Sequence, residues 1–183
     1  FLWPCAVDVT FVEIEHDKNP QPYRVVTREG GVHLRVHSWL HVDVRNKNYF
    51  GAKVKKSQVI ANWKRLDGRV EMFGGSIVDA ESLLGSRETL RLRLPVTIEY
   101  MGAPQSDPIY ADFLERCFVP EGKGTIGMAW EVQVTTEAKG VERTGLVNVE
   151  RDLVCPIGRD MIGDALRELK IDPKTLTKAL ENK

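Results

Sequence analysis

Apolar and polar residues alternate along much of the chain, most regularly from Val32 to Arg45. Even positions in this run are apolar except Ser38, and odd positions are polar except Trp39. Because successive strand side chains point to opposite faces, the run predicts a long strand with one core face and one polar face. It leads into residues 46–51, an Asn- and Gly-containing stretch typical of a turn.

Further alternating runs, separated by turn signals, predict more strands. They cover residues 6–15 (with a bulge or bend), 23–28, 54–66, 69–73, 88–100, 125–137 and 141–154, and residues 76–84 could be strand or loop. We expect Gly74 and Gly75 to end the run at residues 69–73. Pro95 has no N–H to donate to a β-ladder, so we expect it to mark an edge or bulge. The pattern predicts a mainly β fold, an antiparallel sandwich of seven to nine strands like immunoglobulin or fibronectin domains.

Helical spacing occurs in two places. Asp107-Pro108 combines an N-cap carboxylate with a proline at the first helical position, so we expect a short inserted helix that ends at Cys117. From Arg159 the apolar period changes from 2 to 3.6, which predicts a C-terminal helical tail. The expected organisation is a membrane-anchor end or linker at 1–5, the sandwich at 6–157 and the tail at 158–183.

Composition narrows the possible partners. Lys and Arg total 26, as do Asp and Glu, and without a basic excess we expect no nucleic-acid partner. No apolar run approaches the ~20 residues of a membrane span. The aromatic start from Phe1 to Pro4 is what remains when a membrane helix is removed at its interfacial Trp, although a tag remnant or an arbitrary fragment boundary would look the same.

Candidate chemistry is sparse. His33, His37 and His41 share the polar face of the long strand, but four strand residues span about 13 Å, too far for His33 and His37 to bind one ion. The row would gain charge between about pH 7 and 5, which makes a pH-responsive face the hypothesis and a plain solvated face its alternative. No nucleophile elbow, phosphate-binding loop or singled-out carboxylate pair is present, so we predict no catalytic residues, no metal and no cofactor.

The apolar rows of the three longest strands could line either a dry core or an elongated cavity between the sheets. Close packing is the usual arrangement in a sandwich. The alternative is a lipid groove, which would be lined by Val36, Leu40, Leu92, Leu94, Met128 and Trp130.

Three cysteines are present, Cys5, Cys117 and Cys155. Their spacings match no zinc pattern. In a disulfide-permissive compartment one would stay unpaired, whereas in a reducing compartment all three would be free thiols.

The order of several segments carries a family resemblance. They are Phe1 to Val9, Leu40 to Phe50, Asp112 to Cys117 and Leu153 to Pro156. Together they resemble the type 2 late embryogenesis abundant domain (LEA-2, or WHy-like), and most closely the lumenal domain of the transmembrane protein 106 family. The resemblance covers most of residues 1–157.

The resemblance implies a single-pass membrane protein with this domain in the lumen of a lysosome, late endosome or vacuole. It implies a non-enzymatic role in organelle organisation or trafficking through protein contacts, with lipid binding between the sheets as an addition. It also implies a Cys117–Cys155 disulfide, whose loop closure would add about 3–4 kcal/mol. The chain departs from lumenal relatives in having no Asn-x-Ser/Thr sequon. Alternatives are a cytoplasmic LEA-2 protein of stress or desiccation protection and a lipid-transfer module.

Overall fold

Long antiparallel strands dominate the computed structural model, which describes residues 3–16, 26–28, 31–79, 81–102, 107–117 and 124–155. The strands are β1 (Asp8–His16), β2 (Val26–Arg28), β3 (Gly31–Arg45), β4 (Ala52–Lys64), β5 (Val70–Val78), β6 (Ser82–Leu84), β7 (Thr89–Gly102), β8 (Thr125–Ile126), β9 (Met128–Ala138), β10 (Val141–Glu150) and β11 (Leu153–Val154). One helix, α1 (Pro108–Cys117), lies among these described residues. The predicted helical tail from residue 158 lies outside them.

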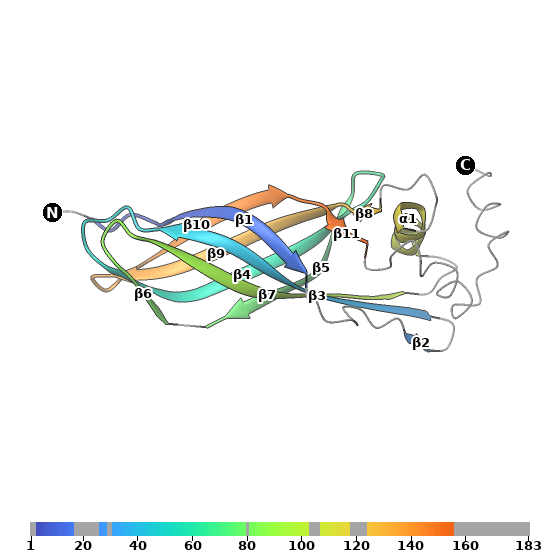
Figure 1. Ribbon diagram of the computed structural model, residues 1–183, viewed down its shortest axis with the longest axis horizontal. Coiled ribbons are helices and arrows are strands. Elements are labelled where there is room, and N and C mark those ends of the chain that lie inside the picture. Colours follow the sequence, from blue (N-terminus) through green and yellow to red (C-terminus); the bar gives the residue numbers. More distant parts are fainter. Residues whose placement is uncertain are drawn as a thin grey trace.

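Nine of these strands form one antiparallel sheet that curls into a sandwich (Figure 1). Their order is β1-β3-β7-β5-β4-β9-β10, with β2 paired to β3 and β6 paired to β4. The chain just before β1 packs closely on β10, where a Cβ on Gly145 would clash with the carbonyl oxygen of Val7. Strands β8 and β11 form a separate two-stranded ladder. The predicted mainly β, antiparallel fold with one inserted helix is confirmed.

Strand β5 joins the two layers through a pair of glycines. Gly74 and Gly75 pair with Ile98 and Thr97 of β7 on one side and with β4 on the other. A Cβ on Gly74 would clash with the Thr97 carbonyl oxygen, and one on Gly75 with that of Val59. The prediction that these glycines end the strand is therefore wrong, because their lack of a Cβ lets β5 run between two close neighbours.

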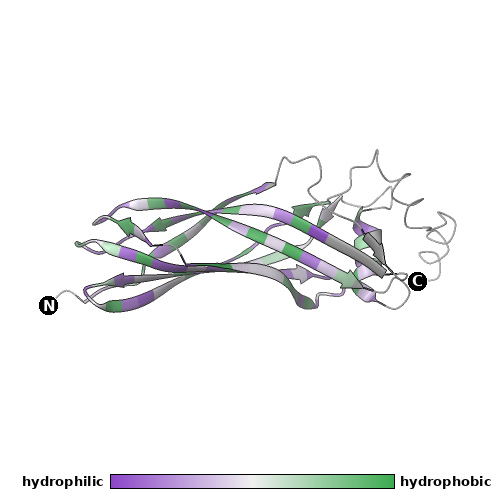
Figure 2. Ribbon diagram, turned by 90° about the horizontal axis from the view of Figure 1, so that it is seen from below, coloured by the Kyte–Doolittle hydropathy of each residue, from purple (hydrophilic) through white to green (hydrophobic). Residues whose placement is uncertain are grey.

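Strand β3 follows the predicted alternation. Val36, Leu40, Val42 and Val44 are buried, whereas odd positions such as Arg35 lie on the outer face. Figure 2 shows apolar and polar residues alternating along the strands. The apolar sides of the two layers of the sandwich face each other and form the core. Trp63 and Trp130 are among its largest fully buried side chains.

Two irregularities follow the predictions. The β1–β3 register shifts between Phe11 and Glu13, which is the expected bulge. Pro95 pairs with Trp39 of β3 on one side, while β7 pairs with β5 only at Thr97 and Ile98. Pro95 therefore stands where the other side of β7 has no ladder partner, as its missing N–H requires.

Candidate functional site

Helix α1 covers the end of the sandwich that lies opposite the start of β1 (Figure 1). Asp107 caps it: Oδ1 accepts a hydrogen bond from the Ile109 amide at 2.9 Å, which confirms the predicted N-cap. The other oxygen, Oδ2, accepts from the Tyr100 hydroxyl at 2.8 Å. Burial, and then this hydrogen bond, raise the pKa of Tyr100 above its ordinary range. We call this end of the molecule the capped pole.

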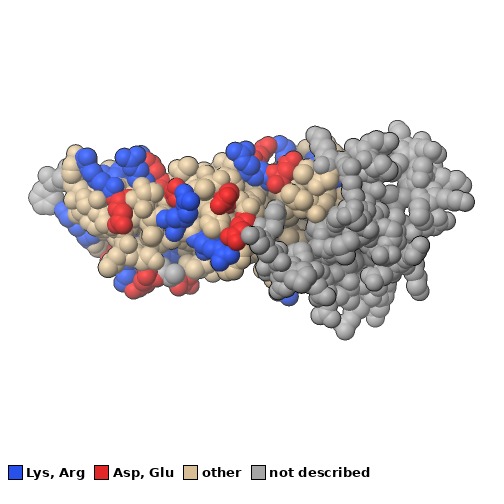
Figure 3. Space-filling model, viewed as in Figure 1, with Lys and Arg blue, Asp and Glu red and all other residues tan. Residues whose placement is uncertain are grey.

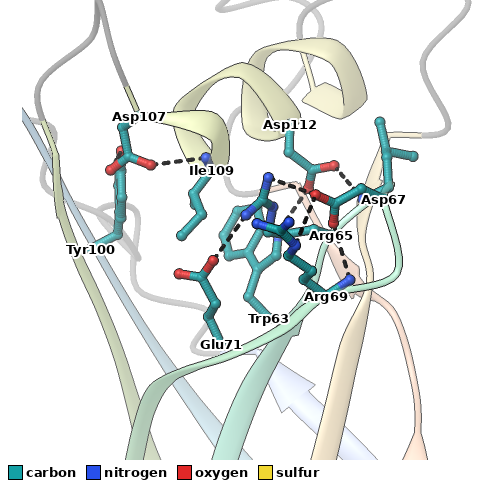
Figure 4. A network of polar contacts seen from close by, with 10 residues as sticks. Trp63, Arg65, Asp67, Arg69, Glu71, Tyr100, Asp107, Ile109 and Asp112 are labelled. Carbon is teal, nitrogen blue, oxygen red and sulfur yellow. Dashed lines mark hydrogen bonds and ion pairs between the residues drawn. The ribbon is translucent and has the colours of Figure 1, made fainter.

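A buried carboxylate joins α1 to the end of β4 (Figure 4). Asp112, only 5% exposed, accepts hydrogen bonds from Trp63 Nε1 at 2.7 Å and from the Leu66 amide at 2.9 Å. Arg116 Nε lies 3.0 Å from Asp112 Oδ2 as an ion pair one turn along the helix, and Arg116 Nη2 donates to the Lys64 carbonyl at 3.1 Å. Each carboxylate oxygen thus has at least one partner, so the group serves as a structural bridge.

Further ion pairs lie next to Asp112, at the β4–β5 hairpin. Arg65 forms ion pairs with Asp67 at 2.8 Å and with Glu71 at 3.1 Å, as Figure 4 shows. Asp67 Oδ1 also accepts from the Arg69 amide, and Gly68 takes the positive φ of 82° that this turn needs. The Asp67-Gly68 turn of the β4–β5 hairpin is therefore held in place beside α1.

A disulfide closes the capped pole. Cys117, the last residue of α1, is bonded to Cys155, which follows β11, with 5.6 Å between their Cα atoms. Backbone bonds support the junction: Gly124 donates to the Arg116 carbonyl and Cys155 donates to the Gly124 carbonyl. The pairing implied by the family resemblance is confirmed, and Cys5 remains a free, exposed thiol.

The histidine row is only partly described. His37 Nδ1 lies 3.1 Å from Thr97 Oγ1 at the surface, and half-buried His41 contacts Glu15 Oε2 of β1 at 2.9 Å. His33 pairs with Met101 through the backbone, and its side chain lies outside the described part of the structure. The pH-responsive face stays a prediction, tested by following the three imidazoles by NMR as the pH falls.

All six residues assigned to the lipid groove fall in or against one hydrophobic cluster. Leu92 is half-buried against this cluster. The other five are buried within it: Val36, Leu40, Leu94, Met128 and Trp130. Burial in the core accounts for all of them, and lipid binding stays a prediction. Native mass spectrometry of protein purified from its own cells tests it through the presence or absence of a copurified lipid.

Within the described ranges, no three His, Cys, Asp or Glu side chains are placed to hold a metal ion. Over the same ranges, no helix is long and apolar enough to cross a membrane. Sequence reasoning missed Asp112, although its spacing of four residues from Arg116 on a helix was a usable signal. Burial, which makes the pair matter, could not be read from that spacing.

The fold defines a class: a curled antiparallel β-sandwich with one end closed by a helix and a disulfide. Neither a family model nor a curated protein matches the chain. Among solved structures, the Arabidopsis thaliana protein AT1g01470 aligns with a TM-score of 0.53 at 12% identity, over 86% of this chain and 87% of that one. At this identity, the likeness shows a shared fold.

Two further solved structures are less similar. A candidate late embryogenesis abundant (LEA) protein, At2g46140.1, aligns with a TM-score of 0.48 at 16% identity, over 85% of this chain and 74% of that one. A protein from Archaeoglobus fulgidus aligns with a TM-score of 0.43 at 9% identity, over 79% and 97% respectively. With TM-scores below 0.5, neither adds to the fold assignment.

Proposed function

We propose that this chain is a non-enzymatic, LEA-2-like domain held at an endolysosomal or vacuolar membrane through its N-terminal side and exposed to the lumen. Its work there is organelle organisation or trafficking through protein contacts. The observation that carries the proposal is the Cys117–Cys155 disulfide at the capped pole. Disulfides persist in oxidising compartments and are rare in the cytosol, so the bond favours a lumenal over a cytoplasmic LEA-2 protein.

The arrangement of the two poles supports a tether at the N-terminal side. The start of β1 and the capped pole lie at opposite ends of the long axis (Figure 1). A tether before β1 would therefore hold the sandwich with α1 directed away from the membrane. Protein partners in the lumen would meet the capped pole first.

Exposed apolar side chains near the capped pole fit a role in protein contacts. Leu66 and Val70 flank the hairpin beside α1, Met101 is the penultimate residue of β7, and Val154 lies next to the disulfide. Each is more than half exposed. Exposed apolar residues are ordinary on a surface, and Trp3 and Tyr49 are exposed at the opposite end, so these four side chains offer one candidate contact surface and do not by themselves define it.

The experiment uses the full-length protein in its own cells. Membranes are separated, washed with carbonate and treated with protease before and after detergent, and thiols are counted by alkylation with and without reductant. We expect an integral-membrane protein, protection until detergent is added, and, by peptide mapping of this domain, a free thiol at Cys5 but not at Cys117 or Cys155. Recovery in the soluble fraction with Cys5, Cys117 and Cys155 all free would overturn the proposal in favour of a cytoplasmic LEA-2 protein.

A further inference from the structure

The end of the molecule opposite the capped pole is built from four short segments, three of them joined by hydrogen bonds and the fourth in contact with them through Lys139 and the Phe50 ring. They are residues 3–7, 46–51, 85–88 and 138–141, and we call them the N-terminal pole. Buried Asn48 accepts from the Cys5 amide at 2.8 Å and donates to the Cys5 carbonyl at 3.0 Å. Buried Asn46 donates to the carbonyls of Phe50 and Gly85, both at 2.9 Å. The two asparagines hold three of the four segments in a fixed arrangement.

Aromatic side chains project from this fixed arrangement. Trp3 is 67% exposed and Tyr49 is 65% exposed, although an aromatic ring normally gains by burial. Tyr49 belongs to the turn that Asn46 and Asn48 clamp, so its position is set by buried hydrogen bonds. These two rings are therefore presented to whatever lies beyond the pole.

Each aromatic ring of the pole has a cation beside it. The Arg87 guanidinium lies 4.0 Å from the Tyr49 ring centre, and the Lys139 ammonium lies 4.2 Å from that of Phe50. Arg143 lies 5.7 Å from the Trp3 ring centre. Three of the five cation–π pairs among the described residues thus gather at this one end.

The pole is basic although the whole chain is neutral. With Asp8, which directly follows the first segment and pairs with Lys47, the pole holds Lys47, Arg87 and Lys139 against Asp8 and Glu88, a net charge of +1, where the chain as a whole has zero. The Glu88 carboxylate turns back into its own loop, where Oε2 accepts from the Gly85 amide at 2.6 Å. Lys47 pairs with Asp8 at the start of β1. Figure 3 shows Lys and Arg side chains at this end of the molecule, with Asp and Glu side chains among them.

We propose that the N-terminal pole rests directly on an anionic bilayer. Exposed Trp and Tyr rings favour the headgroup region, where an apolar body and a polar edge are both accommodated. Lys and Arg beside them are attracted to anionic lipid headgroups, whose field extends about one Debye length from the surface. A pair of this kind can place its aromatic ring in the headgroup region and its cation against an anionic headgroup at the same time. The inference deepens the proposed membrane location and rests on it, naming lipid headgroups as a partner of the domain.

The test measures binding of the 183-residue chain to vesicles by sedimentation. One set contains phosphatidylcholine alone, and the other contains phosphatidylcholine mixed with phosphatidylserine. We expect binding to the anionic set at low salt, little binding to the neutral set, and loss of binding as salt is raised. The Arg87→Ala/Lys139→Ala variant should weaken anionic binding by on the order of tenfold or more. The matched control, Lys64→Ala/Arg69→Ala, removes two cations near the capped pole and should bind like wild type.

Tryptophan fluorescence gives the orientation. Trp63 and Trp130 are buried in the core, and Trp39 is half-buried in the middle of β3 under Arg93, so Trp3 should supply most of any emission shift on vesicle binding, and Trp3→Phe should remove most of it. Absence of binding to anionic vesicles at low salt, or equal loss in the control variant, would overturn the inference. Binding to an acidic protein without binding to vesicles would do the same. If the full-length protein fractionates with membranes but this chain does not bind vesicles, the proposed function stands and the lipid contact fails. If this chain binds anionic vesicles but the full-length protein is not a membrane protein, the lipid contact stands and the proposed function fails.

Discussion

Removing the Asp112 carboxylate should destabilise the protein more than any surface substitution of the same size. In Asp112→Ala, Trp63 Nε1–H and the Leu66 amide lose their acceptor, and the Arg116 guanidinium loses its ion-pair partner. An orphaned donor that is buried costs about 1–3 kcal/mol, and breaking a buried ion pair costs about 3–5 kcal/mol. Because these costs overlap in one network, we expect a loss of about 3–5 kcal/mol in the free energy of unfolding.

The assay is equilibrium unfolding in urea, followed by far-ultraviolet circular dichroism with the disulfide oxidised. Asp112→Asn keeps one oxygen acceptor and loses the charge opposite Arg116, so its loss should be smaller, about 1.5–3 kcal/mol. The matched control is Glu142→Ala on the exposed side of β10, which should change stability by less than about 0.5 kcal/mol. The reasoning fails if Asp112→Ala lies within about 1 kcal/mol of wild type at an unchanged denaturant slope.

Three further predictions concern the rest of the sandwich. Cys117→Ser/Cys155→Ser opens a loop with a sequence separation of 38 and should cost about 4 kcal/mol in urea unfolding, whereas Cys5→Ser should cost almost nothing; equal losses would contradict the entropic account. Gly74→Ala forces a Cβ onto the Thr97 carbonyl oxygen and should cost about 3 kcal/mol or prevent folding, whereas Gly68→Asn in the open hairpin turn should be tolerated; a well-folded Gly74→Ala protein of wild-type stability would refute the close approach. The hydrogen bond from His41, with help from Arg93, lowers the pKa of the Glu15 carboxyl. That contribution to stability is present above the ordinary glutamate pKa and is lost as the pH falls through the lowered one, so Glu15→Gln should be less stable than wild type near pH 7, and the difference should shrink as the pH falls below the ordinary glutamate pKa; a gap of constant size in the urea midpoints would contradict the assignment.

Local patterns in the sequence predicted the parts of the fold that local physics controls. The alternation of β3 fixes which side chains face the core, and the Asp107-Pro108 pair fixes the start of α1. The pattern of residues 6–15 predicted the bulge in β1, and Pro95 predicted an edge or bulge and lies where β7 has a ladder partner on the β3 side alone. Each of these signals depends on a residue and its near neighbours in the chain.

Features that depend on distant neighbours could not be predicted in this way. Gly74 and Gly75 look like a strand end in sequence, and only their pairing with both β4 and β7 reveals the close approach that requires them. Asp112 and Arg116 look like an exposed helix pair, and only the packing of α1 onto Trp63 buries them. The aromatic and basic N-terminal pole comes from four segments spread from Trp3 to Lys139, so no window of sequence contains it.

The disulfide also determines what a protease could do to this protein. The bond between Cys117 and Cys155 encloses β8, β9, β10 and β11 in one covalent ring. A single cut at the exposed β9–β10 turn, beside Lys139, would open the chain without releasing either piece, since both halves remain joined through sulfur. The nicked molecule would keep its mass, apart from one added water, until a reductant arrived. In a hydrolytic compartment, the lifetime of the domain would then be set by reduction as much as by cleavage.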